Sequence, residues 1–166
     1  MKYLTIGFCI FLTLAASRFV PHPPNFTSLL ALSFYVPALL GIRYLPFLVI
    51  SFVLTDIVIG FHSATLFTWG SVILIGLMSK YFIKNIAFRF IGALSGGIVF
   101  YLVTNFGVWL LGSYSFSLEG LLLSYTLAIP FFTSSIISII FFSILIEGIY
   151  FCYKSRQIVY RSFKRL

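Results

Sequence analysis

The chain has 166 residues, of which 61% are hydrophobic, 20% aromatic and only 8% charged, and its mean hydropathy is +1.12. A soluble domain of this size needs many more charged side chains to cover its surface, so the composition excludes a soluble globular protein. The net charge of +8 is unevenly distributed along the chain, so we take it as a signal of membrane topology and expect no nucleic-acid partner.

Six apolar segments follow one another along the chain, and each predicts a membrane-embedded helix. Asn25 precedes the second segment and is predicted to cap its free N–H groups. Pro130 falls within the last segment, which exceeds the ~20 residues that cross a ~30 Å hydrocarbon core. Residues 121–129 are therefore expected to form a separate short helix, before a spanning helix that starts near Phe131. The six segments are residues 3–17, 27–42, 45–59, 65–79, 86–111 and 121–153.

The basic residues predict how these helices are oriented. With six spans, nine of the basic residues and both termini fall on the same side of the membrane. Lys and Arg are retained on the inside, so this side is predicted to be cytoplasmic. Arg18 alone stays outside, whereas Arg89, one turn inside the fifth span, is expected to snorkel to the cytoplasmic face. We expect one six-helix transmembrane domain, residues 1–153, and a basic cytoplasmic tail, residues 154–166. The nine residues are Lys2, Arg43, Lys80, Lys84, Lys154, Arg156, Arg161, Lys164 and Arg165.

The first 17 residues allow a second interpretation. Lys2, the apolar run after it and the small residues Ala15, Ala16 and Ser17 would also suit a cleavable signal peptide. An intact first helix is preferred, because it gives an even number of helices.

Small residues and cysteines in the apolar segments suggest packing roles. Gly92 and Gly96 form a small-xxx-small pattern that permits close helix contact, within the chain or, as an alternative, with a partner. Cys9 and Cys152 have no metal-binding spacing and are interpreted as packing residues.

Polar side chains near the predicted outer face form a candidate binding site. Ionisable groups inside membrane segments cost about 2.5–3.5 kcal/mol, so they normally face the bundle interior and a partner. Asp56 either forms a structural ion pair with Arg18 or a capping contact to the next helix, or it orients an amine, hydroxyl or cation of a ligand. A role in a proton relay is a weaker alternative, because no chain of acidic residues accompanies it. Asn105, inside the fifth segment, either bonds a neighbouring helix or contacts the ligand. Glu119 also falls on this face.

Two histidines complete this candidate site. His22 is surrounded by prolines that favour an extended path. They either hold the ring ready over a pocket or form a rigid connector that turns the chain back into the membrane. His62 lies in a predicted loop, where it either fixes the backbone or contacts a ligand. A metal site formed by both histidines and Asp56 is a weaker alternative, since the three come from separate places. We predict neither a cofactor nor catalytic residues, and a substrate site formed by Arg18, His22, Asn25, Asp56, His62 and Asn105.

Four motifs carry a resemblance to a family of small bacterial membrane proteins that bears a domain-of-unknown-function label. They are Arg18-x-x-Pro-His-Pro-Pro-Asn-Phe-Thr27, Asp56-x-x-x-Gly-x-His62, Thr104-Asn-Phe-Gly-Val-Trp109 and Ala128-Ile-Pro-Phe-Phe132. The resemblance covers the chain from Arg18 to about Gly148. It implies a multi-pass protein of the bacterial inner membrane.

The same pattern is more distantly similar to the S components of energy-coupling-factor transporters, through six short helices and the Asp56-x-x-x-Gly60 motif. This similarity implies uptake of a vitamin-like nutrient without chemistry on it, and a transmembrane partner subunit that meets the first helix. The cell-shape protein MreD is similar in size and helix count. A structural subunit of a larger assembly is therefore the alternative function, since a fold does not fix a function.

Overall fold

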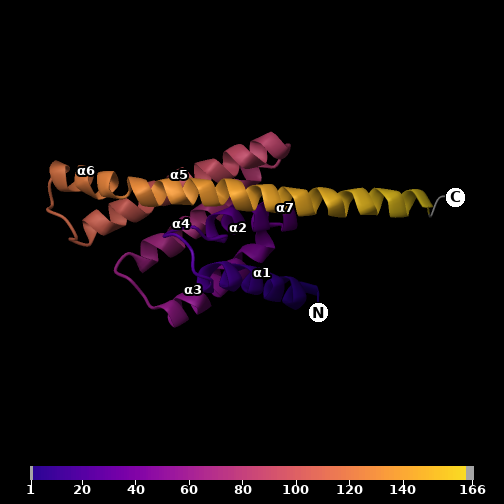
Figure 1. The fold of residues 1–166 in the computed structure, drawn as a ribbon, viewed down its shortest axis with the longest axis horizontal. Coiled ribbons are helices and arrows are strands. Elements are labelled where there is room, and N and C mark those ends of the chain that lie inside the picture. Colours follow the sequence, from indigo (N-terminus) through magenta and orange to yellow (C-terminus); the bar gives the residue numbers. More distant parts are fainter. Residues whose placement is uncertain (1, 164–166) are drawn as a thin grey trace.

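The computed structural model describes residues 2–163, and the side chains of residues 3–156 (Figure 1). Every regular secondary-structure element in this range is a helix, as the sequence predicts. The α-helices are α1 (Lys2–Phe19), α2 (Leu29–Tyr35), α3 (Leu45–Ile59), α4 (Thr65–Met78), α5 (Ile86–Leu110), α6 (Leu118–Leu127) and α7 (Ile129–Phe163). A π-helical segment, η1 (Val36–Leu40), and two 3-10 segments, η2 (Ile42–Tyr44) and η3 (Ser79–Phe82), connect some of them.

Four of the described helical stretches are long and apolar enough to cross a membrane: Ile42–Ile59, Thr65–Phe82, Ile86–Leu110 and Ile129–Arg156. The apolar stretches Tyr3–Phe19, Leu29–Leu40 and Leu118–Leu127 are shorter. Large apolar side chains such as Leu66, Ile149 and Phe151 lie on the outer surface, more than 70% exposed. The structure is therefore that of an all-α, multi-pass membrane protein, whose outward apolar surface faces lipid.

The α2 helix lies at the centre of the bundle, and all seven of its residues are buried. Its two sides belong to two apolar clusters. One includes Leu32 with residues of α1, α3 and α4, and the other includes Phe34 with residues of α4, α5 and α7. A helix that is apolar on every side suits such a position, because neighbouring helices cover it all round.

The second predicted helix, residues 27–42, begins later and changes form at its end. Asn25 does not cap this helix, because Ser28 occupies the cap position. Asn25 instead lies in a turn, with a φ of 62°. In this turn the N–H of Phe26 donates to Pro23 O. Pro37 lacks an N–H, and the chain around it winds as the π-helix η1. Gly41, with a φ of 103°, then ends the helix in a conformation that a side chain would oppose.

The break near Pro130 is where the sequence predicts it. The α6 helix is separate and short, with the hydroxyl of Ser117 accepting a bond from the N–H of Gly120 at its start. Pro130 is the second residue of α7, where a missing N–H breaks no helical bond. The α7 helix continues to Phe163, so the first part of the predicted tail extends the helix; residues 164–166 lie outside the described part.

Both termini lie at one end of the molecule, and the α3–α4 and α5–α6 connections lie at the other (Figure 1). The α1 helix is part of the fold: Leu14 is completely buried, and Ile10 and Ala15 are buried beside it. Gly92 and Gly96 of α5 lie against Phe34 and Ile75, respectively, so their close contact is made within the chain.

Candidate functional site

Arg18 and Asp56 form an ion pair between the end of α1 and the end of α3. Arg18 Nη2 lies 2.6 Å from Asp56 Oδ1, and the two side chains are only 15% and 5% exposed. Arg18 Nη1 also donates to Thr55 Oγ1 at 2.5 Å, and the guanidinium lies 4.7 Å from the centre of the Phe52 ring. Of the alternatives for Asp56, the structure shows the ion pair.

Trp69 of α4 completes this cluster. Its indole Nε1–H donates to the second carboxylate oxygen, Asp56 Oδ2, at 2.7 Å. Both oxygens of Asp56 therefore have partners, one from α1 and one from α4. The cluster ties three helices together and neutralises its own charge, which is what a charged group in an apolar bundle requires.

Asn25 and Asn105 are brought together elsewhere, at a small cavity of about 100 Å³ between α5, α7 and the loop before α2. Asn105 Nδ2 donates to Tyr101 O one turn earlier, at 2.7 Å, which leaves its second N–H and its oxygen available. Asn25 is exposed and held in a left-handed conformation that asparagine tolerates better than most residues. The remaining lining residues are Phe100, Tyr101, Thr104, Ala128, Phe131, Phe132 and Ser135.

The two histidines lie on exposed loops. His22 Nδ1 donates to Pro23 O at 2.7 Å, so the ring folds back on its own loop. At His62 it is the backbone that bonds: its N–H donates to Thr65 Oγ1 at 3.0 Å, and its carbonyl accepts from the same hydroxyl at 2.6 Å. Within residues 3–156, His, Cys, Asp and Glu side chains form no group of three close enough to hold a metal ion, so the structure does not support the alternative metal site.

A second buried ion pair joins α5 to α7. Arg89 Nε and Nη2 lie 2.6 and 2.7 Å from the two oxygens of Glu147, and the side chains are 12% and 6% exposed. The expectation that Arg89 snorkels to the membrane surface is therefore wrong, because a carboxylate on the facing helix holds the guanidinium inside. The sequence signal was available: Arg89 lies about one turn inside the fifth apolar segment, and Glu147 lies nearly two turns before the end of the sixth.

An apolar groove of about 470 Å³ lies between α1, α2–η1 and α7, and we call it the α1–α7 groove. Its lining residues are Thr5, Ile6, Cys9, Ile10, Thr13, Leu32, Tyr35, Val36, Leu39, Leu40, Ile146, Ile149, Tyr150 and Tyr153. The sequence gives no sign of it, because helices that are apolar on every side do not reveal which faces leave a gap. Cys9 is exposed in this groove, and Cys152 is exposed on α7. Neither is buried, so the interpretation of both as packing residues is wrong.

The structure thus divides the predicted site into three parts: a closed ion pair, a small amide-lined cavity and two loop histidines. Comparison with curated proteins and with solved structures gives no significant match. Residues 1–161, nearly the whole chain, match the model of a protein family, so this chain belongs to the family of unknown function DUF6580.

Proposed function

We propose that the protein is a substrate-binding subunit for membrane uptake, of the S-component type, which takes a small polar nutrient from the end of the bundle opposite the termini. The observation that carries the proposal is the cavity between Asn25 and Asn105. Its two carboxamides retain unused donors and acceptors, which is how binding sites fix the orientation of a polar ligand.

The cavity favours a neutral ligand or the neutral edge of a larger one. Its lining residues include amides, hydroxyls and aromatic rings, and none carries a formal charge. Arg18 and Asp56 would reach a ligand only if their pair opened, so their role in this proposal is to fix α1 against α3. His22 and His62 would meet a solute as it enters from outside. No bond of the solute changes, since binding and release complete the task.

The size of the cavity sets a condition on a vitamin-like ligand. Its volume, about 100 Å³, is well below the roughly 300–1,000 Å³ typical of drug-sized ligand sites. We therefore propose that a ligand of this size enters after residues 20–28, the loop that carries Asn25, move away. The prolines of this loop limit its conformations, which reduces the entropy lost when it closes.

Native mass spectrometry of the full chain, extracted from its own membranes, tests the proposal. The wild type is expected to retain a small molecule that Asn25→Gly and Asn105→Leu lose. Glycine is the suitable replacement at position 25, because it adopts the positive φ without strain. Asn85→Ser is the matched control, since it removes a carboxamide at the opposite end but keeps an oxygen that caps α5. Equal retention by all four proteins would refute the assignment.

A structural subunit, similar in role to MreD, is the second candidate. The two closed ion pairs favour it, because they leave Arg18, Asp56, Arg89 and Glu147 without a free charge for a ligand. A structural subunit would tolerate Asn25→Gly and Asn105→Leu in cells but require its contacts with other proteins. Growth or uptake defects of these two variants, with unchanged protein levels, would decide for the binding subunit.

A further inference from the structure

We propose that the α1–α7 groove binds one anionic phospholipid, with an acyl chain in the groove and the phosphate held by Arg43 and Arg156. The proposal does not depend on the nutrient site, which lies between α5, α7 and the loop before α2. It rests on two features that meet at the end of the bundle with both termini: an unfilled apolar groove and arginines without a carboxylate partner.

The groove offers hydrocarbon to whatever occupies it. Most of its lining side chains are aliphatic or aromatic, with Ile6 and Ile10 on the α1 side and Ile146 and Ile149 on the α7 side. The hydroxyl of Thr13, which also lines it, donates to Cys9 O of its own helix at 2.9 Å and needs no further partner. A groove of this kind in a membrane protein is filled by apolar chains, because water there would lose its hydrogen bonds.

The charges show why the occupant has an acidic head group. The whole chain has three acidic side chains, and two of them, Asp56 and Glu147, are already bound to arginines. The third, Glu119, begins α6, at the end away from the termini (Figure 1). Among the described residues, neither Arg43 nor Arg156 pairs with a side-chain carboxylate, and both are exposed, so they are available to an acidic head group.

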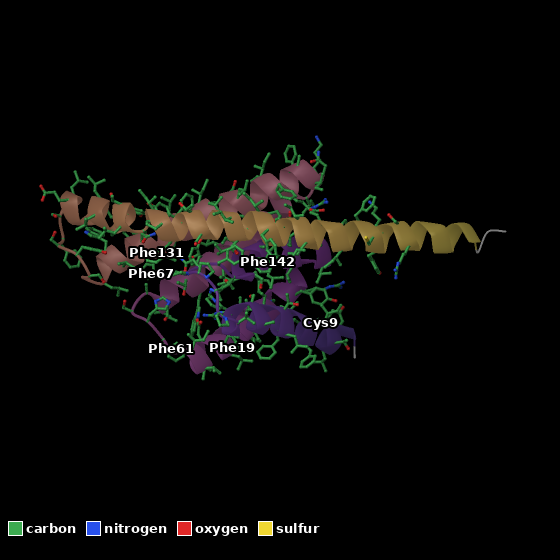
Figure 2. The ribbon with its side chains drawn as sticks, in the orientation of Figure 1. Cys9, Phe19, Phe61, Phe67, Phe131 and Phe142 are labelled. Carbon is green, nitrogen blue, oxygen red and sulfur yellow. The ribbon has the colours of Figure 1, made fainter. Side chains whose placement is uncertain are left out.

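Arg156 lines an adjoining hollow on α7 that shares Ile149 and Tyr153 with the groove, and Arg43 follows the η1 end of the groove in the chain. Leu40 lines it three residues before Arg43, and Tyr153 lines it three residues before Arg156, a spacing that puts the last two on one face of α7. The Arg43 guanidinium lies 5.3 and 5.4 Å from the ring centres of Tyr3 and Tyr44, which position it without neutralising it. Figure 2 shows Cys9, another lining residue, toward the end of the molecule with both termini.

Lipid binding to the purified full chain tests this inference. Native mass spectrometry with dioleoyl phosphatidylglycerol and dioleoyl phosphatidylcholine, which differ in head group only, should show one retained phosphatidylglycerol and little phosphatidylcholine. Arg43→Gln with Arg156→Gln should weaken the phosphatidylglycerol affinity about 25-fold, at roughly fivefold for each charge. Lys80→Gln with Lys84→Gln is the matched control, because it removes two charges from the α4–α5 connection and should change the affinity little.

A second pair of variants tests the groove itself. Cys9→Trp adds bulk inside it and should abolish retention, whereas Leu66→Trp adds similar bulk on an exposed face of α4 and should not. Equal retention of the two lipids, equal loss in the lysine control, or full retention by Cys9→Trp would each overturn the proposal. A second protein that occupies the groove and excludes lipid would overturn it as well. If Cys9→Trp fails to fold, the arginine and lysine pairs still decide.

Discussion

Arg18 Nη2 lies 2.6 Å from Asp56 Oδ1, and this contact fastens the end of α1 to the end of α3. Trp69 adds α4 through the other carboxylate oxygen. An unpaired charge is costly in an apolar bundle, so each of the two ions depends on the other to remain there. The pair also explains why α1 belongs to the folded protein: without Arg18, Asp56 would be a buried anion with one neutral donor.

Removing either member of this pair should destabilise the protein strongly. Arg18→Gln or Asp56→Leu is expected to lower the free energy of unfolding by about 3 kcal/mol, because each leaves the other member of the pair as a buried charge without a counterion. The double variant should recover part of this loss, since no charge remains, although Trp69 still lacks its acceptor. Unfolding in dodecyl sulfate, followed by far-ultraviolet circular dichroism, measures the three differences. Single variants as stable as the wild type would contradict the structural role of the pair.

The Arg89–Glu147 pair makes the same kind of prediction for α5 and α7. Glu147→Leu should destabilise the protein by about 3 kcal/mol, because a bidentate, largely buried arginine loses its only carboxylate. Glu119→Leu is the control, since Glu119 is exposed in the first turn of α6. The control should change the unfolding midpoint little. Equal losses of stability at the two positions would show that the buried ion pair of Glu147 does not stabilise the protein more than an exposed glutamate does.

The sequence predicted the helices well because hydropathy, proline and glycine act locally. The separation of α6 from α7 followed from Pro130, and the bounds of α3 are those of the apolar segment 45–59. The second helix was placed less well. Asn25 has the side chain of a cap, but the preceding prolines put it in a turn three residues before the cap position, Ser28.

The site was harder to predict, because it depends on which helices are neighbours. Arg18 and Asp56 were named as possible partners, but Trp69 was not, and Arg89 and Glu147 are 58 residues apart in the chain. In a membrane protein both the core and the surface are apolar, so hydropathy does not identify the buried face of a helix. The exposed position of Cys9 and the α1–α7 groove could not be found for this reason.

Replacing glycine by alanine should change the stability of the protein in opposite directions at two positions, one in α5 and one in α7. A Cβ at Gly92 would meet the ring of Phe34 and lie 2.6 Å from Phe82 Cβ, so Gly92→Ala should cost about 1–3 kcal/mol through overpacking. A Cβ at Gly148 of α7 would meet nothing within 4 Å, so Gly148→Ala should stabilise the helix by up to about 1 kcal/mol. The same dodecyl sulfate titration measures both. A neutral Gly92→Ala would show that α5 and α2 are not in close contact.

The orientation of the bundle in the membrane gives a further prediction. Figure 2 shows Phe61 and Phe131 toward one end of the molecule and Cys9 toward the other. His62 follows Phe61 in the exposed α3–α4 loop, whereas Lys84 lies in the exposed α4–α5 connection, which also carries Lys80. Since basic residues are retained in the cytoplasm, we expect position 62 outside the cell and position 84 inside.

Cysteine labelling measures this sidedness directly. In a background with Cys9 and Cys152 replaced by serine, His62→Cys should react in intact cells with a thiol reagent that does not cross membranes. Lys84→Cys should react only after the cells are opened. Labelling both variants after lysis shows that each thiol is accessible in principle. The reverse pattern would place the amide-lined cavity on the cytoplasmic side, where it could not capture a nutrient from outside, and the uptake proposal would be refuted even if a ligand binds there.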